Sequence, residues 1–233
     1  MFMTSLFSDL TEEDKSKAVK DLIHESMPRP SFFLLIGLSV LMATFGLALN
    51  NSAVVIGSML IAPILSPILS LSLGIVMSDS SLLMRSVRTL FLSSALGVGL
   101  AAVSTLFLSN PFGAEVMSRT LPSLIYFSIA FVAGFAVAFA RVNPTMSDTI
   151  PGIAVSVSLI PPLAVIGMGI ARLNWAITSG AFLLFLTNIV GIVFATMIVF
   201  SLMNFYIKRS VATATLQEEI RTQQLETKEK DEE

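Results

Sequence analysis

The chain has 233 residues, of which 54% are hydrophobic and 13% are charged, and its formal net charge is −2. An ordinary soluble domain carries about 25% charged residues to cover its surface, so this composition indicates an integral membrane protein and argues against a soluble enzyme. The chain contains no cysteine, which excludes disulfides, thiolate chemistry and cysteine-ligated metals.

Residues 1–29 are polar and predict a short cytoplasmic amphipathic helix. Thr11 stands at the N-cap position and Asp14 at the capping-box position. Apolar residues then recur at helical spacing as far as Pro28, at Ala18, Val19, Leu22, Ile23 and Met27. We expect this helix to lie on the membrane face or to pack on a neighbouring helix, with a binding or gating role as the alternative.

Six continuous apolar stretches follow and predict an all-α membrane domain over residues 30–207. A bilayer core of about 30 Å needs roughly 20 helical residues, and the 49 residues from Pro30 to Ser78 contain no charged residue and can hold two spans. The stretches do not alternate, which argues against barrel strands. The six predicted transmembrane helices are Ser31–Leu49, Ser52–Met77, Leu90–Leu108, Leu121–Ala140, Ile150–Ala171 and Trp175–Tyr206.

The basic residues predict the orientation of these helices. Six spans place both termini on one side, and that side then carries nine Lys and Arg against Arg119 and Arg172 on the other. The positive-inside rule therefore predicts cytoplasmic termini. Residues 208–233, rich in Gln and Glu, predict a polar cytoplasmic tail that forms either a frayed helix or one that supports an oligomer. The nine residues are Lys15, Lys17, Lys20, Arg29, Arg85, Arg88, Arg141, Lys208 and Arg209.

An internal repeat relates the two halves of the membrane domain. Leu60-Ile-Ala-Pro63 reappears 99 residues later as Leu159-Ile-Pro-Pro162, and the first and fourth spans align at the same offset. Repeat one covers about 31–108 and repeat two about 121–206. Because each unit has three spans, the second unit must be inverted, so we predict inverted-topology repeats of the kind that transporters use.

Prolines interrupt the second and fifth predicted helices. A proline inside a helix removes one hydrogen bond, and in lipid the freed carbonyl must be met by a neighbouring helix, a hydroxyl or a wet cavity. We therefore predict Pro-broken helices that line a path for a small solute or ion, with simple proline kinks as the alternative. The residues concerned are Pro63, Pro67, Pro161 and Pro162, with Ser58, Ser66, Ser156 and Ser158 as lining hydroxyls.

Four further polar residues are candidates for this path. Thr187 and Asn188 lie in the middle of the sixth span, Asn51 at the outer mouth of the second and Asp148 at the inner mouth of the fifth. Ordinary helix capping or a bond to a neighbouring helix is the alternative for each. No ionisable residue lies mid-span, which argues against a buried proton relay and against an intramembrane enzyme. A passive channel, a uniporter or sodium coupling remains open.

Three segments resemble the DUF389 family of bacterial and archaeal membrane proteins. They are Asn51–Pro67, Pro151–Ala164 and Leu186–Ile192, in order within a resemblance that spans roughly 30–205. The resemblance implies a multi-pass protein of the prokaryotic inner membrane and assigns little function. We predict a transporter or channel without cofactor, metal or nucleic-acid partner; a sensor or scaffold that works through its cytoplasmic termini is the alternative. Small-residue faces around Gly97, Gly134 and Gly167 predict close helix packing, within one chain or in a homo-oligomer.

Overall fold

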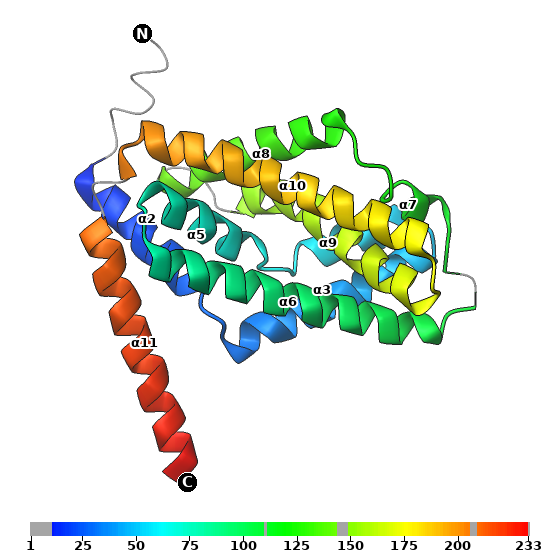
Figure 1. Ribbon diagram of the computed structural model, residues 1–233, viewed down its shortest axis with the longest axis horizontal. Helices are drawn as coiled ribbons and strands as arrows, with labels where there is room; N and C mark the ends of the chain where they lie inside the picture. The colour runs from blue at the N-terminus through cyan, green and yellow to red at the C-terminus, as the bar shows by residue number, and fades with distance from the viewer. Residues whose placement is uncertain (1–10, 110, 144–148, 206–208, 233) are drawn as a thin grey trace.

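The computed structural model describes residues 11–109, 111–143, 149–205 and 209–232, without side chains at 149–158, 209 and 226–232. The described part is all-helical and contains no strand. Its helices form an elongated bundle, with α11 extending away from one end (Figure 1). They are α2 Glu12–Glu25, α3 Pro30–Ala48, α4 Ser52–Met59, α5 Leu65–Val76, α6 Ser80–Leu106, α7 Ala114–Met117, α8 Leu124–Val142, α9 Thr149–Ala171, α10 Trp175–Leu202 and α11 Arg209–Glu232.

Among the residues whose side chains the structure describes, four helices are long and apolar enough to cross a membrane. They are α3, α6, α8 and α10, and they coincide with the first, third, fourth and sixth predicted spans. Helix α6 begins ten residues before the prediction, because the Asp79 carboxylate accepts hydrogen bonds from the backbone N–H groups of Ser81 and Leu82 and caps the helix there. Helix α5, Leu65–Val76, and the part of α9 with described side chains, Leu159–Ala171, are shorter apolar stretches.

The second predicted span consists of two helices. Helix α4 ends at Met59, the residues from Leu60 to Ile64 form a connection, and α5 begins at Leu65. Two prolines four residues apart explain this geometry. A single helix through Pro63 and Pro67 would lose two hydrogen bonds. Restarting the helix at Leu65 puts Pro67 in the first turn, where its missing N–H has no intrahelical partner to lose.

The fifth predicted span is one uninterrupted helix. Helix α9 runs from Thr149 to Ala171 with Pro161 and Pro162 inside it, so the predicted break at these prolines is wrong. The fixed φ of a proline, about −65°, is itself helical. Two adjacent prolines therefore keep helical geometry and concentrate the lost bonds in one turn, where packed neighbours can support it.

Three helix-to-helix connections share one tight geometry. In each, a residue with positive φ, 52° or 53°, precedes the N-cap of the next helix. The N-cap N–H donates to the carbonyl of a glycine five residues earlier, at 2.9 Å in all three. A Cβ on that glycine would lie 2.9–3.0 Å from a backbone nitrogen of the following helix, so only glycine permits the close approach. The three pairs of glycine and N-cap are Gly46 and Asn51, Gly74 and Asp79, and Gly169 and Asn174.

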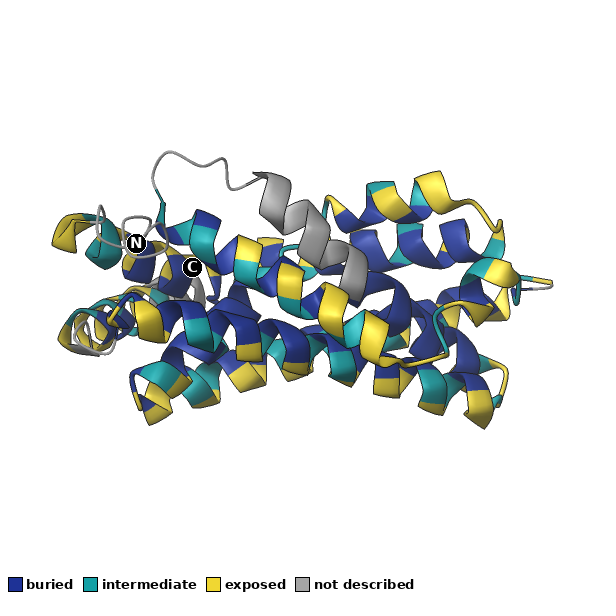
Figure 2. Ribbon diagram, turned by 90° about the horizontal axis from the view of Figure 1, so that it is seen from above, coloured by how far each residue is buried: buried dark blue, intermediate teal, exposed yellow. Residues whose placement is uncertain are grey.

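The bundle interior is formed around α9, which packs on α3, α6, α8 and α10. Figure 2 shows buried residues along the inner faces of the helices and exposed ones along their outer faces. A Cβ at Gly167 would lie 2.5 Å from the Val98 carbonyl of α6, and one at Gly134 would lie 2.8 Å from the Ile192 Cα of α10. The predicted close packing at these glycines is confirmed. At Gly99, a Cβ would have no atom of another helix within 4 Å.

Helix α2 covers one end of the bundle. The predicted capping box is present, with Thr11 and Asp14 bonding reciprocally. The Thr11 hydroxyl, followed by the Thr11 backbone N–H, lowers the pKa of Asp14 below its ordinary value of 3.8. Leu22 and Ile23 are fully buried on the inner face of α2, which packs on α5 and on α11. The predicted amphipathic helix is therefore docked on the bundle.

Candidate functional site

The connection between α4 and α5 lies at the mid-depth of the bundle. Ser39 is the tenth of the 19 residues of α3, and its hydroxyl donates to the Ser58 carbonyl at 2.7 Å. Ser58 lies one residue before the end of α4. The break that begins at Leu60 is thus level with the midpoint of a helix whose length matches a bilayer core.

Four consecutive backbone carbonyls are released at this break. The N–H of Leu60 and that of Ile61 turn back to Gly57 and Ser58, at 3.3 and 3.2 Å. Among the residues that the structure describes, none donates a hydrogen bond to the carbonyls of Leu60, Ile61, Ala62 or Pro63. Such groups at membrane depth are tolerated where they are covered by protein or line a wet cavity. The C-terminus of α4 adds the negative end of its helix dipole at the same place.

Burial differs between the two proline segments. At the break, Leu60 is 57% exposed and Pro63 is partly exposed. Pro161 and Pro162 are buried, and Leu163 next to them packs against the position of Gly97 on α6. The α9 prolines therefore belong to a tightly packed centre, and the α4–α5 connection is the accessible member of the pair.

Three of the other predicted path residues, Ser58, Thr187 and Asn51, form local hydrogen bonds. The Ser58 hydroxyl donates to the Val55 carbonyl at 2.6 Å, and the Thr187 hydroxyl donates to the Leu183 carbonyl at 2.8 Å. Asn51 caps α4 by accepting from two backbone amides. Asn188 is buried within α10. Asp148 lies outside the described residues, and the side chains of Ser156 and Ser158 are likewise not described.

The hydroxyls of Ser66 and Ser70 on α5 face α2 and form hydrogen bonds with it. The Ser66 hydroxyl donates to Glu25 Oε2 at 2.9 Å, and the Ser70 hydroxyl donates to the Leu22 carbonyl at 2.9 Å. Glu25 Oε2 also pairs with Arg141 Nη2 at the end of α8. One carboxylate thus ties α2 to both the broken helix α5 and the end of α8, an arrangement that the helical spacing of α2 alone does not reveal.

The same end of the bundle gathers contacts from α11. Glu219 pairs with His24 and Arg29 at 2.6 and 3.3 Å. The Thr213 hydroxyl donates to the Asp79 carboxylate at 3.1 Å, so α11 also touches the cap of α6. Within the described ranges, no group of three or more His, Asp or Glu side chains lies close enough to hold a metal ion. The contacts of Glu219 and Thr213 therefore connect α11 to α2 and to the N-cap of α6.

Comparison with known proteins finds one family and one relative. Residues 59–194 match the family described as "Domain of unknown function (DUF389)". The chain is 28% identical over 212 residues to an uncharacterised protein of Methanocaldococcus jannaschii, MJ0678, in an alignment that covers 85% of this chain and 65% of the relative. The chain therefore spans just under two thirds of that relative's length. No solved structure matches the chain.

Proposed function

Since the chain belongs to the DUF389 family, whose description assigns no activity, we propose from its own geometry that it is a membrane transporter or channel for a small polar solute or cation. The observation that carries the proposal is the row of four carbonyls released at mid-depth between α4 and α5. Discontinuous helices near the midplane are the usual position of substrate and ion sites in transporters.

The chemistry of the break indicates which solutes it can bind. Carbonyl oxygens accept hydrogen bonds and coordinate cations, and the C-terminal end of α4 adds negative potential. The N-terminus of α5 opens on the same connection and has no side-chain cap. No Asp, Glu, Lys, Arg or His lies mid-span, so the proposed path relies on dipoles and hydroxyls and involves no buried proton relay and no catalysis.

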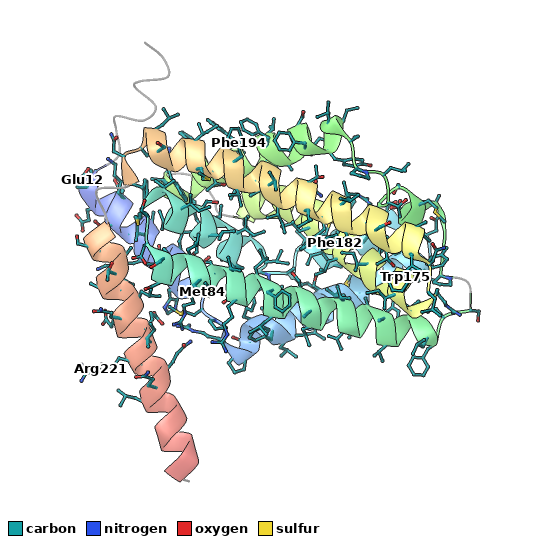
Figure 3. All side chains as sticks on the ribbon, viewed as in Figure 1. Glu12, Met84, Trp175, Phe182, Phe194 and Arg221 are labelled. Carbon is teal, nitrogen blue, oxygen red and sulfur yellow. The ribbon has the colours of Figure 1, made fainter. Side chains whose placement is uncertain are left out.

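The proposal includes an inverted-topology repeat, which matching turns and matching helix contacts support. The turn from α5 to α6 and the turn from α9 to α10 have the same geometry, with Gly74 and Asp79 in one matching Gly169 and Asn174 in the other. These turns lie near opposite ends of the bundle, as the labels of Met84 and Trp175 indicate in Figure 3. The contacts between helices also correspond in the two units. Helix α6 of the first unit packs on α9 of the second, and α10 of the second packs on α5 of the first. Within the units, α3 packs on α4 and α8 packs on α9.

The spacing between the proline and the turn glycine that follows it differs between the two units, and this difference accounts for a helix break in the first unit alone. Eleven positions separate Pro63 from Gly74, while seven separate Pro162 from Gly169. The difference of four residues is about one helical turn. We propose that the two units share an ancestral arrangement and that the first accommodates its extra turn as the connection at Leu60–Ile64.

The proposal includes the orientation and the setting of the protein. Arg29, Arg85 and Arg141 contact α2 or α11 at one end of the bundle, which supports a cytoplasmic position for that end in a prokaryotic inner membrane. A homo-oligomer is also part of the proposal, since the small residues of the bundle helices permit close approach between chains as well as within one chain.

A sensor or scaffold is the second candidate, favoured by the attachment of α2 to α5. Glu25 and Leu22 accept hydrogen bonds from Ser66 and Ser70 of the broken helix. Displacement of α2 by a partner would therefore act directly on α5. This function requires no flux of solute, so flux measurements distinguish it from transport.

The test is reconstitution of the purified full chain in liposomes, with uptake of sodium, potassium, anions and small neutral solutes measured against protein-free vesicles. We expect flux of at least one class. The double variant Pro63→Ala with Pro67→Ala restores two N–H donors and permits a continuous helix, so we expect this flux to fall at least tenfold. Pro122→Ala, in the exposed connection before α8, is the matched control. No flux in any class, or full flux in the double variant, would contradict the proposal.

A further inference from the structure

A pocket of about 840 Å³ opens between the first turns of α6, the residues before and at the start of α3, and α11. Its described lining has two arginines and no acidic residue. Hydroxyl groups come from the start of α6 and apolar walls from α3, α6 and α11. The residues that matter here are Arg85, Arg88, Ser80, Ser81, Phe33 and Leu92. This combination of positive charge, hydroxyls and apolar surface is suited to an amphipathic anion.

Neither arginine is bound to a carboxylate. Arg85 Nη2 donates to Gln223 Oε1 at 2.5 Å, while its Nε is buried without a hydrogen-bond partner among the described residues. Arg88 is exposed and forms no ion pair within the described ranges. Glu219 interacts electrostatically with Arg85 without bonding to it, since the carboxylate oxygens of Glu219 pair with His24 and Arg29. Two guanidinium groups therefore remain for an anion from outside the chain.

The pocket lies at the boundary between the polar end and the apolar body of the bundle. Arg88 is the last charged residue before the uncharged stretch that begins at Thr89. Met84 and Phe91, on either side of it along α6, are 68% and 70% exposed apolar side chains. Figure 3 places Met84 on α6 near the end from which α11 extends. Arginines at such a boundary meet the level of lipid headgroups, and exposed apolar side chains next to them meet the acyl chains.

We propose that this pocket binds the phosphate headgroup of an anionic phospholipid. Arg85 and Arg88 donate to the phosphate oxygens, and the hydroxyls of Ser80 and Ser81 donate to the headgroup. An acyl chain lies against Phe33 and Leu92. Because α11 supplies one wall of the pocket, the bound lipid fixes α11 to the start of α6. The proposal does not depend on transport, and its test measures no flux.

The test is lipid retention by the purified full chain in detergent, measured by native mass spectrometry. The protein is incubated with phosphatidylglycerol or with phosphatidylcholine. In a further sample, soluble glycerol phosphate is added as a competitor of phosphatidylglycerol. One basic residue at a membrane surface contributes about 1 kcal/mol, which corresponds to about a fivefold change in affinity. We expect Arg88→Gln to lower retention of phosphatidylglycerol about fivefold and the double variant with Arg85→Gln about 25-fold. Arg221→Gln, an exposed arginine of α11 outside the pocket, is the charge-matched control and should leave retention unchanged.

If the double variant does not fold, the single variant Arg88→Gln tests the proposal. Arg88 forms no ion pair within the described ranges, so this substitution removes no ion pair from the fold. Retention of phosphatidylglycerol by Arg88→Gln equal to that of the unmodified chain would overturn the proposal. Equal retention of phosphatidylcholine would overturn it as well, because the pocket would then select no charge. Full competition by glycerol phosphate would assign the pocket to a soluble phosphate ester and overturn the lipid assignment.

Discussion

Gly167→Ala provides a quantitative test of how α9 is held against α6. The added Cβ would lie 2.5 Å from the Val98 carbonyl oxygen, 2.6 Å from Ala101 Cβ and 2.9 Å from the Ala102 nitrogen. None of these atoms is the end of a flexible side chain, so the two helices must separate. Overpacking of this kind costs about 1–3 kcal/mol, and contacts to backbone favour the upper end. Replacing glycine by alanine also stabilises the helix by about 1 kcal/mol through its higher helix propensity, so the net destabilisation is about 2 kcal/mol.

Gly99→Ala is the matched control for this substitution. The position is on α6 and has no atom of another helix within 4 Å of the added Cβ, so only the propensity gain of about 1 kcal/mol remains. Reversible unfolding of each variant in mixed detergent micelles, followed by circular dichroism, gives the free energies of unfolding. We expect the two variants to differ by about 3 kcal/mol. Equal stabilities would refute the close approach of α9 to α6 at Gly167.

Three further predictions concern the polar contacts. Ser39→Ala removes the hydroxyl that donates to the Ser58 carbonyl and should lower the free energy of unfolding by about 1 kcal/mol in the same assay; no change would mean that water replaces it. Glu25→Gln, which weakens the bonds to Arg141 and Ser66, should raise the rate of proteolysis at α2 several-fold, and an unchanged rate would show that apolar packing alone holds α2. The lowered pKa of Asp14 means that its carboxylate stabilises α2 above pH 3.8 and that this contribution disappears as the pH falls through the lowered value. Hydrogen exchange at the start of α2, corrected for intrinsic rates, should rise below that pH, and a flat profile would argue against the capping box.

Hydrophobicity and caps were sufficient to predict most of the helices. The helices α3, α8 and α10 follow from long uncharged stretches, and the start of α2 follows from the residue types at Thr11 and Asp14. Such features depend on neighbours along the chain, so one sequence is enough to predict them. The start of α6 was missed because the uncharged stretch begins beyond Arg88, while the cap at Asp79 begins the helix earlier.

The outcome at the two proline segments could not be predicted from the prolines alone. Leu60-Ile-Ala-Pro63 and Leu159-Ile-Pro-Pro162 are close in sequence, yet the first lies in a connection and the second inside a helix. The difference depends on the second proline at Pro67 and on the spacing to the next turn, which is set by tertiary packing. Ser66 likewise faces α2 because α2 docks on α5, a contact between segments 41 residues apart.

The central claim is that water and solute reach the carbonyls between α4 and α5. The chain has no cysteine, so a single introduced thiol reports only on its own position. Leu60→Cys places a thiol at the break, and Val190→Cys places one at a similarly exposed position near the middle of α10, with exposed fractions of 57% and 56%. Maleimide reacts with a thiolate, which forms only in water. In intact membranes we predict rapid labelling by a membrane-impermeant maleimide at Leu60→Cys and none at Val190→Cys. Absence of labelling at both positions would show that the break faces lipid, and would contradict the account.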